Sequence, residues 1–114
     1  MTRSWRRLDE FGYHAATSAN PGVSLVLLGQ PHCGACKAAK ALLPVLLPDT
    51  VATLFDVDVA VSGALAHEFE LFHLPALALY KNGAFHAWVN APLEASTLAE
   101  VIHLALDAPA AEAP

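Results

Sequence analysis

The sequence predicts a single α/β domain in which a central mixed β-sheet is flanked by α-helices. Stretches with the apolar character of strands alternate with amphipathic helical stretches, and an Asn-Gly pair separates the last two strand-like stretches. Strands separated by helices pair in parallel and a hairpin adds an antiparallel pair, so the sheet should be mixed. The chain has 114 residues, of which 55% are hydrophobic and 15% charged, which suits one compact core and excludes intrinsic disorder.

The predicted elements follow the order helix, strand, helix, strand, helix, hairpin and helix. From the N-terminus they are a helix at residues 8–18, a turn at Asn20-Pro21-Gly22, a strand at 23–28, a helix at about 33–47, a strand at 51–57, a helix at 63–72, strands at 76–80 and 84–89 and a helix at about 94–106. We assign one domain to residues 1–114, with its core over about residues 8–106 and a frayed tail at 107–114.

The first three elements are predicted from the distribution of apolar residues. Leu8, Phe11 and Ala15 recur on one side of the first helix. The run at 23–28 is apolar, short and contains Val, which favours a strand that is buried on both faces. The helix that follows is rich in Ala and Leu, and Pro44 should kink or interrupt it because proline has no N–H.

The later elements are predicted from spacing and from turn residues. Leu65, Phe69 and Phe72 recur at helical intervals, and Leu74-Pro75 ends that pattern. Asn82-Gly83 between two strand-like runs is a strong hairpin signal. In the last helix, Thr97 and Glu100 have the spacing of a capping box.

The two cysteines lie in one tetrapeptide, Cys33-Gly34-Ala35-Cys36. A disulfide of this spacing closes a very small loop and stabilises a fold less than one that joins distant segments, so redox chemistry or metal binding is the better explanation. His32 is too close to Cys33 to complete an ordinary metal site, and the other histidines show no ligand spacing. We therefore expect no metal.

The element order, with a CxxC motif opening the helix after a buried strand, resembles the thioredoxin family. The matching residues are Cys33-Gly34-Ala35-Cys36-Lys37, Asp56-Val57-Asp58, and Leu74-Pro75 followed by the strand and Asn-Gly turn at 77–83. The resemblance covers about residues 8–106. It implies a thioredoxin fold and thiol–disulfide exchange on protein substrates, without a cofactor.

The resemblance also implies roles for individual residues. Cys33, at the start of the helix, attacks a substrate disulfide, and Cys36 resolves the mixed disulfide. Gly34-Ala35 is the spacer of the motif. A cis bond before Pro75 would place the backbone of Leu74 beside the cysteines, where it can pair with an extended substrate segment.

The sequence departs from the usual pattern of the family at several positions. His32 stands where the family has Trp, Gly34-Ala35 where it has Gly-Pro, and Leu74 where it commonly has Thr, Ile or Val. Pro44 comes about one turn later than the helix proline of the family. Leu27 falls near the position of the family's buried acid and cannot accept a proton. The chain is thus a divergent member, and a binding or chaperone-like module with little redox turnover is the alternative hypothesis.

The proton of Cys36 needs an acceptor other than Leu27. His32 lies beside Cys33 and is a candidate substrate contact and proton relay, although an exposed side chain without such a role is the simpler interpretation. Asp56 and Asp58 lie where a strand meets a loop, and one of them could approach the motif from the neighbouring strand. We expect instead that both are solvated at the strand end.

Charge and hydropathy exclude several partners. A net charge of −5 offers no broad cationic surface for nucleic acid, and no apolar run approaches the roughly 18 residues of a membrane span. Arg3, Arg6 and Arg7 are not followed by the apolar segment of a secretory signal. We therefore expect a cytoplasmic reductant of protein disulfides, recycled by a thioredoxin reductase-like enzyme.

Overall fold

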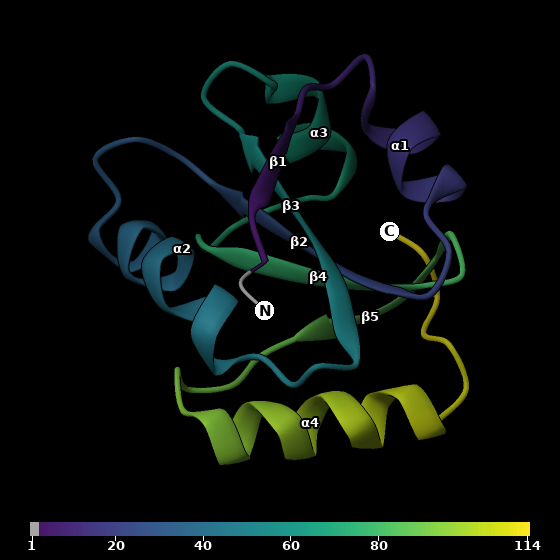
Figure 1. The fold of residues 1–114 in the computed structure, drawn as a ribbon. Coiled ribbons are helices and arrows are strands. Elements are labelled where there is room, and N and C mark those ends of the chain that lie inside the picture. Colours follow the sequence, from purple (N-terminus) through teal and green to yellow (C-terminus); the bar gives the residue numbers. More distant parts are fainter. Residues whose placement is uncertain (1–2) are drawn as a thin grey trace.

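A computed structural model describes residues 3–114, which form a five-stranded mixed sheet flanked by four helices (Figure 1). The strands lie in the order β1-β3-β2-β4-β5. The elements are β1 (Trp5–Leu8), α1 (Tyr13–Ala19), β2 (Val23–Gly29), α2 (Gly34–Leu46), β3 (Val51–Asp58), α3 (Gly63–Glu68), β4 (Ala76–Lys81), β5 (Ala84–Val89) and α4 (Ala95–Asp107). Within residues 3–114, every helix is shorter or less apolar than a membrane span requires.

Strand β2 lies at the centre of the sheet and fixes the register on both sides. It pairs in parallel with β3, where Leu27 lies opposite Asp56, and antiparallel with β4, where Leu28 lies opposite Ala76. β1 extends the sheet by parallel pairing with β3, and β5 pairs antiparallel with β4. One end of the sheet therefore contains the last residues of β1, β2 and β3 and the first residues of β4. We call it the Gly29 end of the sheet.

Each face of the sheet carries one hydrophobic core, so the prediction of a strand buried on both faces is confirmed. Alternate residues of β2 enter the two cores, and Figure 1 shows α2 and α4 on one side and α1 and α3 on the other. The first core includes Leu25, Leu27, Ala39, Leu43, Leu98 and Ile102. The second includes Tyr13, Val26, Leu28, Phe55, Leu65 and Phe69.

The predicted helix at residues 8–18 is wrong at its start. Residues 5–8 form β1, and α1 begins only at Tyr13. Phe11, which was expected on the apolar side of the helix, is 89% exposed. Asp9 explains the difference, because its carboxylate accepts hydrogen bonds from the backbone N–H groups of Phe11 and Gly12 and so forms a turn.

Pro44 does not interrupt helix α2, which continues to Leu46. Proline has no N–H to donate, so the carbonyl of Lys40, four residues earlier, loses its helical partner. The indole Nε1–H of Trp5 donates to that carbonyl at 2.8 Å. A side chain of β1 thus replaces the missing helical hydrogen bond.

Helix α3 is shorter than predicted. It ends at Glu68, and Glu70 adopts a φ of 52°, with which a helix cannot continue. Leu65 and Phe69 are buried, as their spacing predicted. Phe72 is 88% exposed, because it lies beyond the end of the helix.

The predicted capping box of Thr97 and Glu100 is wrong, because α4 already begins at Ala95 with Glu94 as its N-cap residue. The hydroxyls of Ser96 and Thr97 donate to the Glu94 carboxylate at 2.8 and 3.1 Å. These hydrogen bonds lower the pKa of Glu94 below its usual value. Beyond the helix, the N–H of Ala111 donates to the carbonyl of His86 in β5.

The hairpin predicted at Asn82-Gly83 is confirmed. Both residues have positive φ, 51° and 85°, as a tight turn that matches the twist of the sheet requires. The N–H of Asn82 donates to the carbonyl of Gly22, and its side-chain oxygen accepts from the Gly22 N–H. Gly83 approaches the carbonyl of Ser18 so closely that a Cβ atom would collide with it.

Two buried tyrosines connect α1 to β4. The hydroxyls of Tyr13 and Tyr80 lie 2.7 Å apart, and the hydroxyl of Thr17 donates to the carbonyl of Tyr13. Burial raises the pKa of both phenols, so both stay neutral over the physiological range.

Arg3 fixes the end of helix α2. Its guanidinium donates four hydrogen bonds of 2.7–2.9 Å to backbone carbonyls at and just after the end of the helix. The acceptors are the carbonyls of Pro44, Leu47, Pro48 and Val51. A cation at this position also complements the negative end of the helix dipole.

We expect the substitution Arg3→Ala to lower the free energy of unfolding by about 2 kcal/mol, because four partly buried carbonyls lose a charged donor. Arg6→Ala is the matched control. Arg6 is exposed and lies over the Phe55 ring at 5.4 Å, so its loss should cost about 0.5–1 kcal/mol. Urea unfolding followed by circular dichroism measures both variants, and equal losses would contradict the role given to Arg3.

Candidate active site at the start of helix α2

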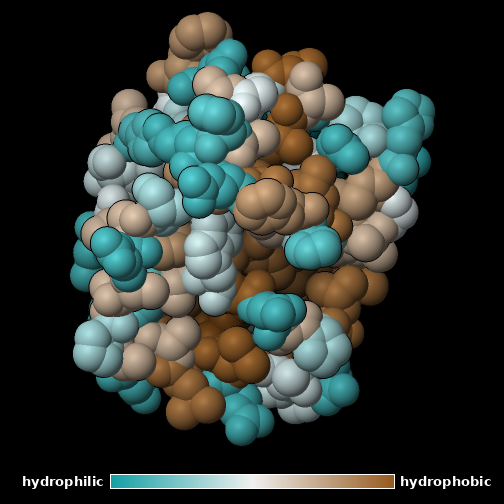
Figure 2. Space-filling view, turned by 180° about the vertical axis from the view of Figure 1, so that it is seen from behind, coloured by the Kyte–Doolittle hydropathy of each residue, from teal (hydrophilic) through white to brown (hydrophobic). Residues whose placement is uncertain are grey.

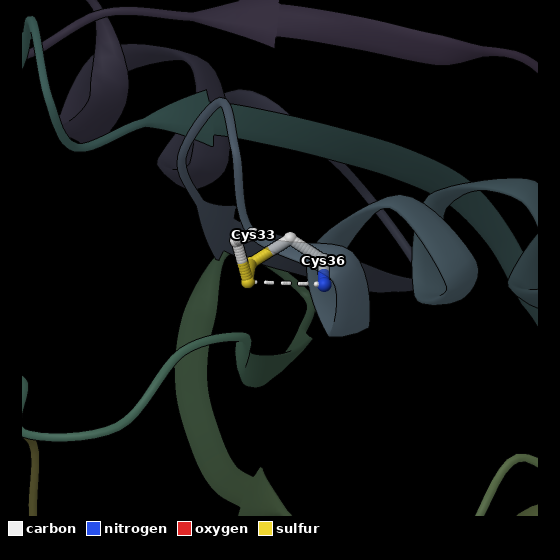
Figure 3. Close-up of a disulfide and its surroundings, with 2 residues drawn as sticks. All are labelled: Cys33 and Cys36. Carbon is white, nitrogen blue, oxygen red and sulfur yellow. Dashed lines mark hydrogen bonds between the residues drawn. A yellow bond between two sulfur atoms is a disulfide. The ribbon is translucent and has the colours of Figure 1, made fainter.

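Cys33 is the N-cap residue of helix α2, and Cys36 lies in its first turn. The Cys33 backbone is extended, with φ −100° and ψ 106°, and its Sγ accepts a hydrogen bond from the N–H of Cys36 at 3.2 Å. The sulfur thus lies where the free N–H groups of a helix N-terminus favour a negative charge. The two sulfur atoms are bonded as a disulfide (Figure 3).

The two cysteines differ in exposure. Cys33 is half-buried, whereas Cys36 is 5% exposed. Cys36 packs directly on Gly29 at the end of β2, where an added Cβ would lie 3.0 Å from Sγ and 3.1 Å from Cβ of Cys36. The absence of a side chain at Gly29 is therefore what lets the helix approach the strand.

The bond between Leu74 and Pro75 is cis, in agreement with what the resemblance implied. Both residues are half-buried. Ala76, which follows them, pairs with Leu28, so the segment enters the sheet next to Gly29 and the disulfide. Figure 3 shows the green ribbon of this part of the chain beneath the two sulfur atoms.

A groove of about 480 Å³ adjoins Pro75. Its walls are largely apolar and come from the segment before β4, from the start of β4 and from β5. They include Phe69, Phe72, Pro75, Leu77, Trp88 and Val89. On the face opposite to that of Figure 1, hydrophobic surface is also visible within a hollow (Figure 2). The sequence predicted Pro75 as part of the site but not these aromatic walls.

His32 precedes Cys33 in an exposed loop. Its φ is 65°, in the left-handed region that residues with a Cβ adopt at a cost. The side chain faces solvent, so its roles as substrate contact and proton relay stay predictions. Gly34 and Ala35 are exposed in the first turn of α2.

Asp56 is 4% exposed, so the expectation that it is solvated at the strand end is wrong. β3 places it opposite Leu27, on the face that α2 covers. Its Oδ2 lies 2.8 Å from Nη2 of Arg7 and 3.0 Å from Nζ of Lys40. The carboxylate thus joins β1, β3 and α2 through ion pairs.

A cavity of about 170 Å³ lies between this carboxylate and the buried cysteine. Its walls include Leu27, Gly29, Cys36, Lys40, Asp56 and Asp58. Asp58 is half-buried, and its carboxylate accepts the N–H of Ala60 at 2.9 Å, which holds the turn after β3. Asp56 and Cys36 therefore line the same partly open cavity.

No group of three or more His, Cys, Asp and Glu side chains within residues 3–114 is arranged to hold a metal ion. Three of the histidines instead have separate partners. His14 contacts Glu68, His86 contacts the carbonyl of Ala105, and His103 contacts Thr50.

Comparison with known proteins agrees with this geometry. The Thioredoxin family model matches residues 7–104. No curated protein sequence matches the chain.

Two solved structures show the same fold. A thioredoxin of Malassezia sympodialis, Mala s 13, aligns with a TM-score of 0.66 and 17% identity over 94% of this chain and 91% of its own. The zinc-bound form of human ERp44 aligns with a TM-score of 0.69 and 16% identity over 89% of this chain. This chain spans 32% of the ERp44 chain. The prediction of a thioredoxin fold is confirmed.

We expect Gly29→Ala to lower the free energy of unfolding of the oxidised protein by about 1–3 kcal/mol, because the new methyl group overpacks Cys36. Gly34→Ala is the control: nothing lies within 4 Å of its added Cβ, and alanine in a helix should stabilise by about 0.5–1 kcal/mol. Urea unfolding of both variants should thus give effects of opposite sign. A loss of the same size at both positions would contradict the close contact.

Proposed function

Because the chain belongs to the thioredoxin family, we propose that it exchanges thiols and disulfides with protein substrates through Cys33 and Cys36. The observation that carries the proposal is the pairing of a half-exposed N-cap cysteine with a buried cysteine in the same helical turn. This pair has the accessibility that a nucleophile and a resolving thiol need.

In the first step, the Cys33 thiolate attacks one sulfur of a substrate disulfide. A bond forms between Cys33 and that sulfur, the substrate S–S bond breaks, and the second substrate sulfur leaves as a thiolate that takes a proton from solvent. The N–H groups at the start of α2 stabilise the attacking thiolate, because their partial positive charge lies at its sulfur.

In the second step, Cys36 loses its proton and attacks the Cys33 sulfur of the mixed disulfide. The bond between Cys33 and Cys36 forms, and the remaining substrate sulfur leaves with the electron pair. The protein dithiol is oxidised by two electrons and the substrate disulfide is reduced to two thiols. The compact geometry of Cys33 and Cys36 favours this intramolecular step.

The surface around the disulfide suits an exposed apolar segment of a polypeptide. Phe11 follows β1, Val61 follows β3 and Phe72 precedes β4, so all three lie in loops at the Gly29 end of the sheet. They are 73–89% exposed. Large apolar side chains gathered at one end of a small domain typically mark a binding surface. We include Leu74, Pro75 and His32 in this substrate surface.

The same loops favour a second candidate function, a thioredoxin-fold binding or chaperone-like module with little redox turnover. Leu27 also supports this second function, because a leucine stands at the position near which the family has an acid that would assist Cys36. This alternative predicts binding of unfolded polypeptides that does not depend on either cysteine.

We further propose that the protein acts in the cytoplasm as a reductant and that a thioredoxin reductase-like enzyme recycles it. The glutathione poise of the cytosol keeps exposed dithiols of this kind reduced. Gly34-Ala35 between the cysteines does not by itself set the potential.

Reduction of insulin by dithiothreitol tests the function. The wild-type protein should accelerate precipitation of the insulin B chain, and Cys33→Ser should return the rate to that of dithiothreitol alone, because the attacking thiolate is gone. Cys36→Ser should stop turnover but accumulate a mixed disulfide that mass spectrometry detects. An unchanged rate in Cys33→Ser would eliminate the oxidoreductase proposal, and continued suppression of aggregation by that variant would support the binding module.

Equilibration in glutathione buffers tests whether the protein acts as a reductant or as an oxidant. We expect the reduction potential of the Cys33–Cys36 pair to lie closer to about −270 mV, the value of thioredoxin, than to about −120 mV, that of a strong periplasmic oxidant. Alkylation of the free thiols followed by mass spectrometry gives the oxidised fraction. A potential near the oxidising value would overturn the assignment as a reductant.

A further inference from the structure

The cavity between Cys36 and Asp56 leads to an inference about how the buried thiol loses its proton. We propose that Asp56 is the proton acceptor for Cys36, reached through water in this cavity. The inference rests on the proposed exchange at Cys33 and Cys36. It assigns to β3 a role that Leu27 of β2 cannot fill, because a leucine side chain has no group that takes a proton.

The sheet register places Asp56 one strand away from Leu27, at the same level. Residues of β3 alternate between the two faces, and Leu54, two positions before Asp56, belongs to the core under α2 and α4. Asp56 therefore faces α2, the helix that carries Cys36. The shared cavity agrees with this placement, since both residues line it.

The cavity is large enough to hold water. Its volume of about 170 Å³ far exceeds the roughly 15 Å³ that one water molecule needs. The carboxylate of Asp56 and the ammonium of Lys40 supply the polar partners that a buried water requires. Water in this cavity can thus carry the proton from Cys36 to Asp56.

One oxygen of the carboxylate is left for this task. The contacts that Arg7 and Lys40 make all end on Oδ2, at 2.8–3.0 Å. No donor within residues 3–114 contacts Oδ1. Oδ1 can therefore accept a hydrogen bond from water and then a proton, while Oδ2 of the neutral acid still accepts hydrogen bonds from Arg7 and Lys40.

The charged groups around Asp56 come from three elements. Arg7 lies on β1, Lys37 and Lys40 lie on α2, and Asp58 lies on β3. Arg7 and Lys40 offset the cost of burying the carboxylate. Their side chains are 56% and 44% exposed, so water can solvate both cations while Asp56 is protonated.

The Cys36 thiol gives its proton through water to Asp56, the Cys36 thiolate attacks Cys33 and the substrate thiolate leaves. Asp56 then returns the proton through water to the departing thiolate or to solvent. The carboxylate is regenerated, so no further reactant is needed.

Reaction of the reduced protein with one equivalent of dithiobis-nitrobenzoate separates the two steps. The first nitrothiobenzoate released reports attack by Cys33, and the second reports resolution by Cys36. We expect Asp56→Asn to slow the second release about tenfold or more at pH 7 and to leave the first within about twofold. The deficit should shrink as the pH rises above the ordinary thiol pKa of about 8.5, because the thiol then ionises without help.

Asp58→Asn is the matched control, because Asp58 lines the same cavity from the same strand and the change is chemically identical. It should leave both releases within about twofold of wild type. Asp56→Glu keeps a carboxylate and should restore most of the second rate. A second release that is unchanged in Asp56→Asn, or slowed by the same factor at every pH, overturns the inference. Absence of the first release in wild type would instead contradict the proposed function.

Discussion

The buried carboxylate of Asp56 is the constraint on which the arrangement of the N-terminal half depends. A carboxylate that is 4% exposed is costly unless cations and hydrogen bonds surround it. Arg7 supplies one cation from β1 and Lys40 supplies another from α2. These ion pairs require β1 to lie beside β3 and α2 to lie across them. The side chain of Asp56 thus connects the edge strand β1 to α2, the helix that follows Cys33 and contains Cys36.

Arg3 and Trp5, which precede Arg7 in the chain, bind the C-terminal half of helix α2 and the residues just after it. Trp5 donates to the carbonyl that Pro44 leaves free, and Arg3 donates to the carbonyls at the end of α2. The second half of helix α2 is therefore held by two residues of one short segment, Arg3 and Trp5. Since Cys33 begins this helix and Cys36 packs on Gly29, the position of the disulfide depends on contacts made far from it in the sequence.

The sequence predicted the elements whose signals are local. The continuous apolar run of β2, the Asn82-Gly83 turn and the helix that follows the cysteines all reflect preferences of neighbouring residues. Strand β1 was missed because it is only four residues long and its charged side chains hide its pairing. The role of Arg7 there depends on Asp56, 49 positions away in the sequence. No local pattern reports such a contact.

In the candidate site, too, the sequence predicted the residues with local signals but not a contact between distant residues. Cys33, Cys36 and Leu74-Pro75 were found because the motif and the proline stand out in the sequence. The burial of Asp56 was not foreseen, although the alternation of β3 offered a signal, since Leu54 and Asp56 must share one face. A leucine in β2 and an aspartate opposite it in β3 together leave the site with one buried acid. An acid on β3 can thus lie at the same level as a position on β2, because the register of the sheet pairs Leu27 with Asp56.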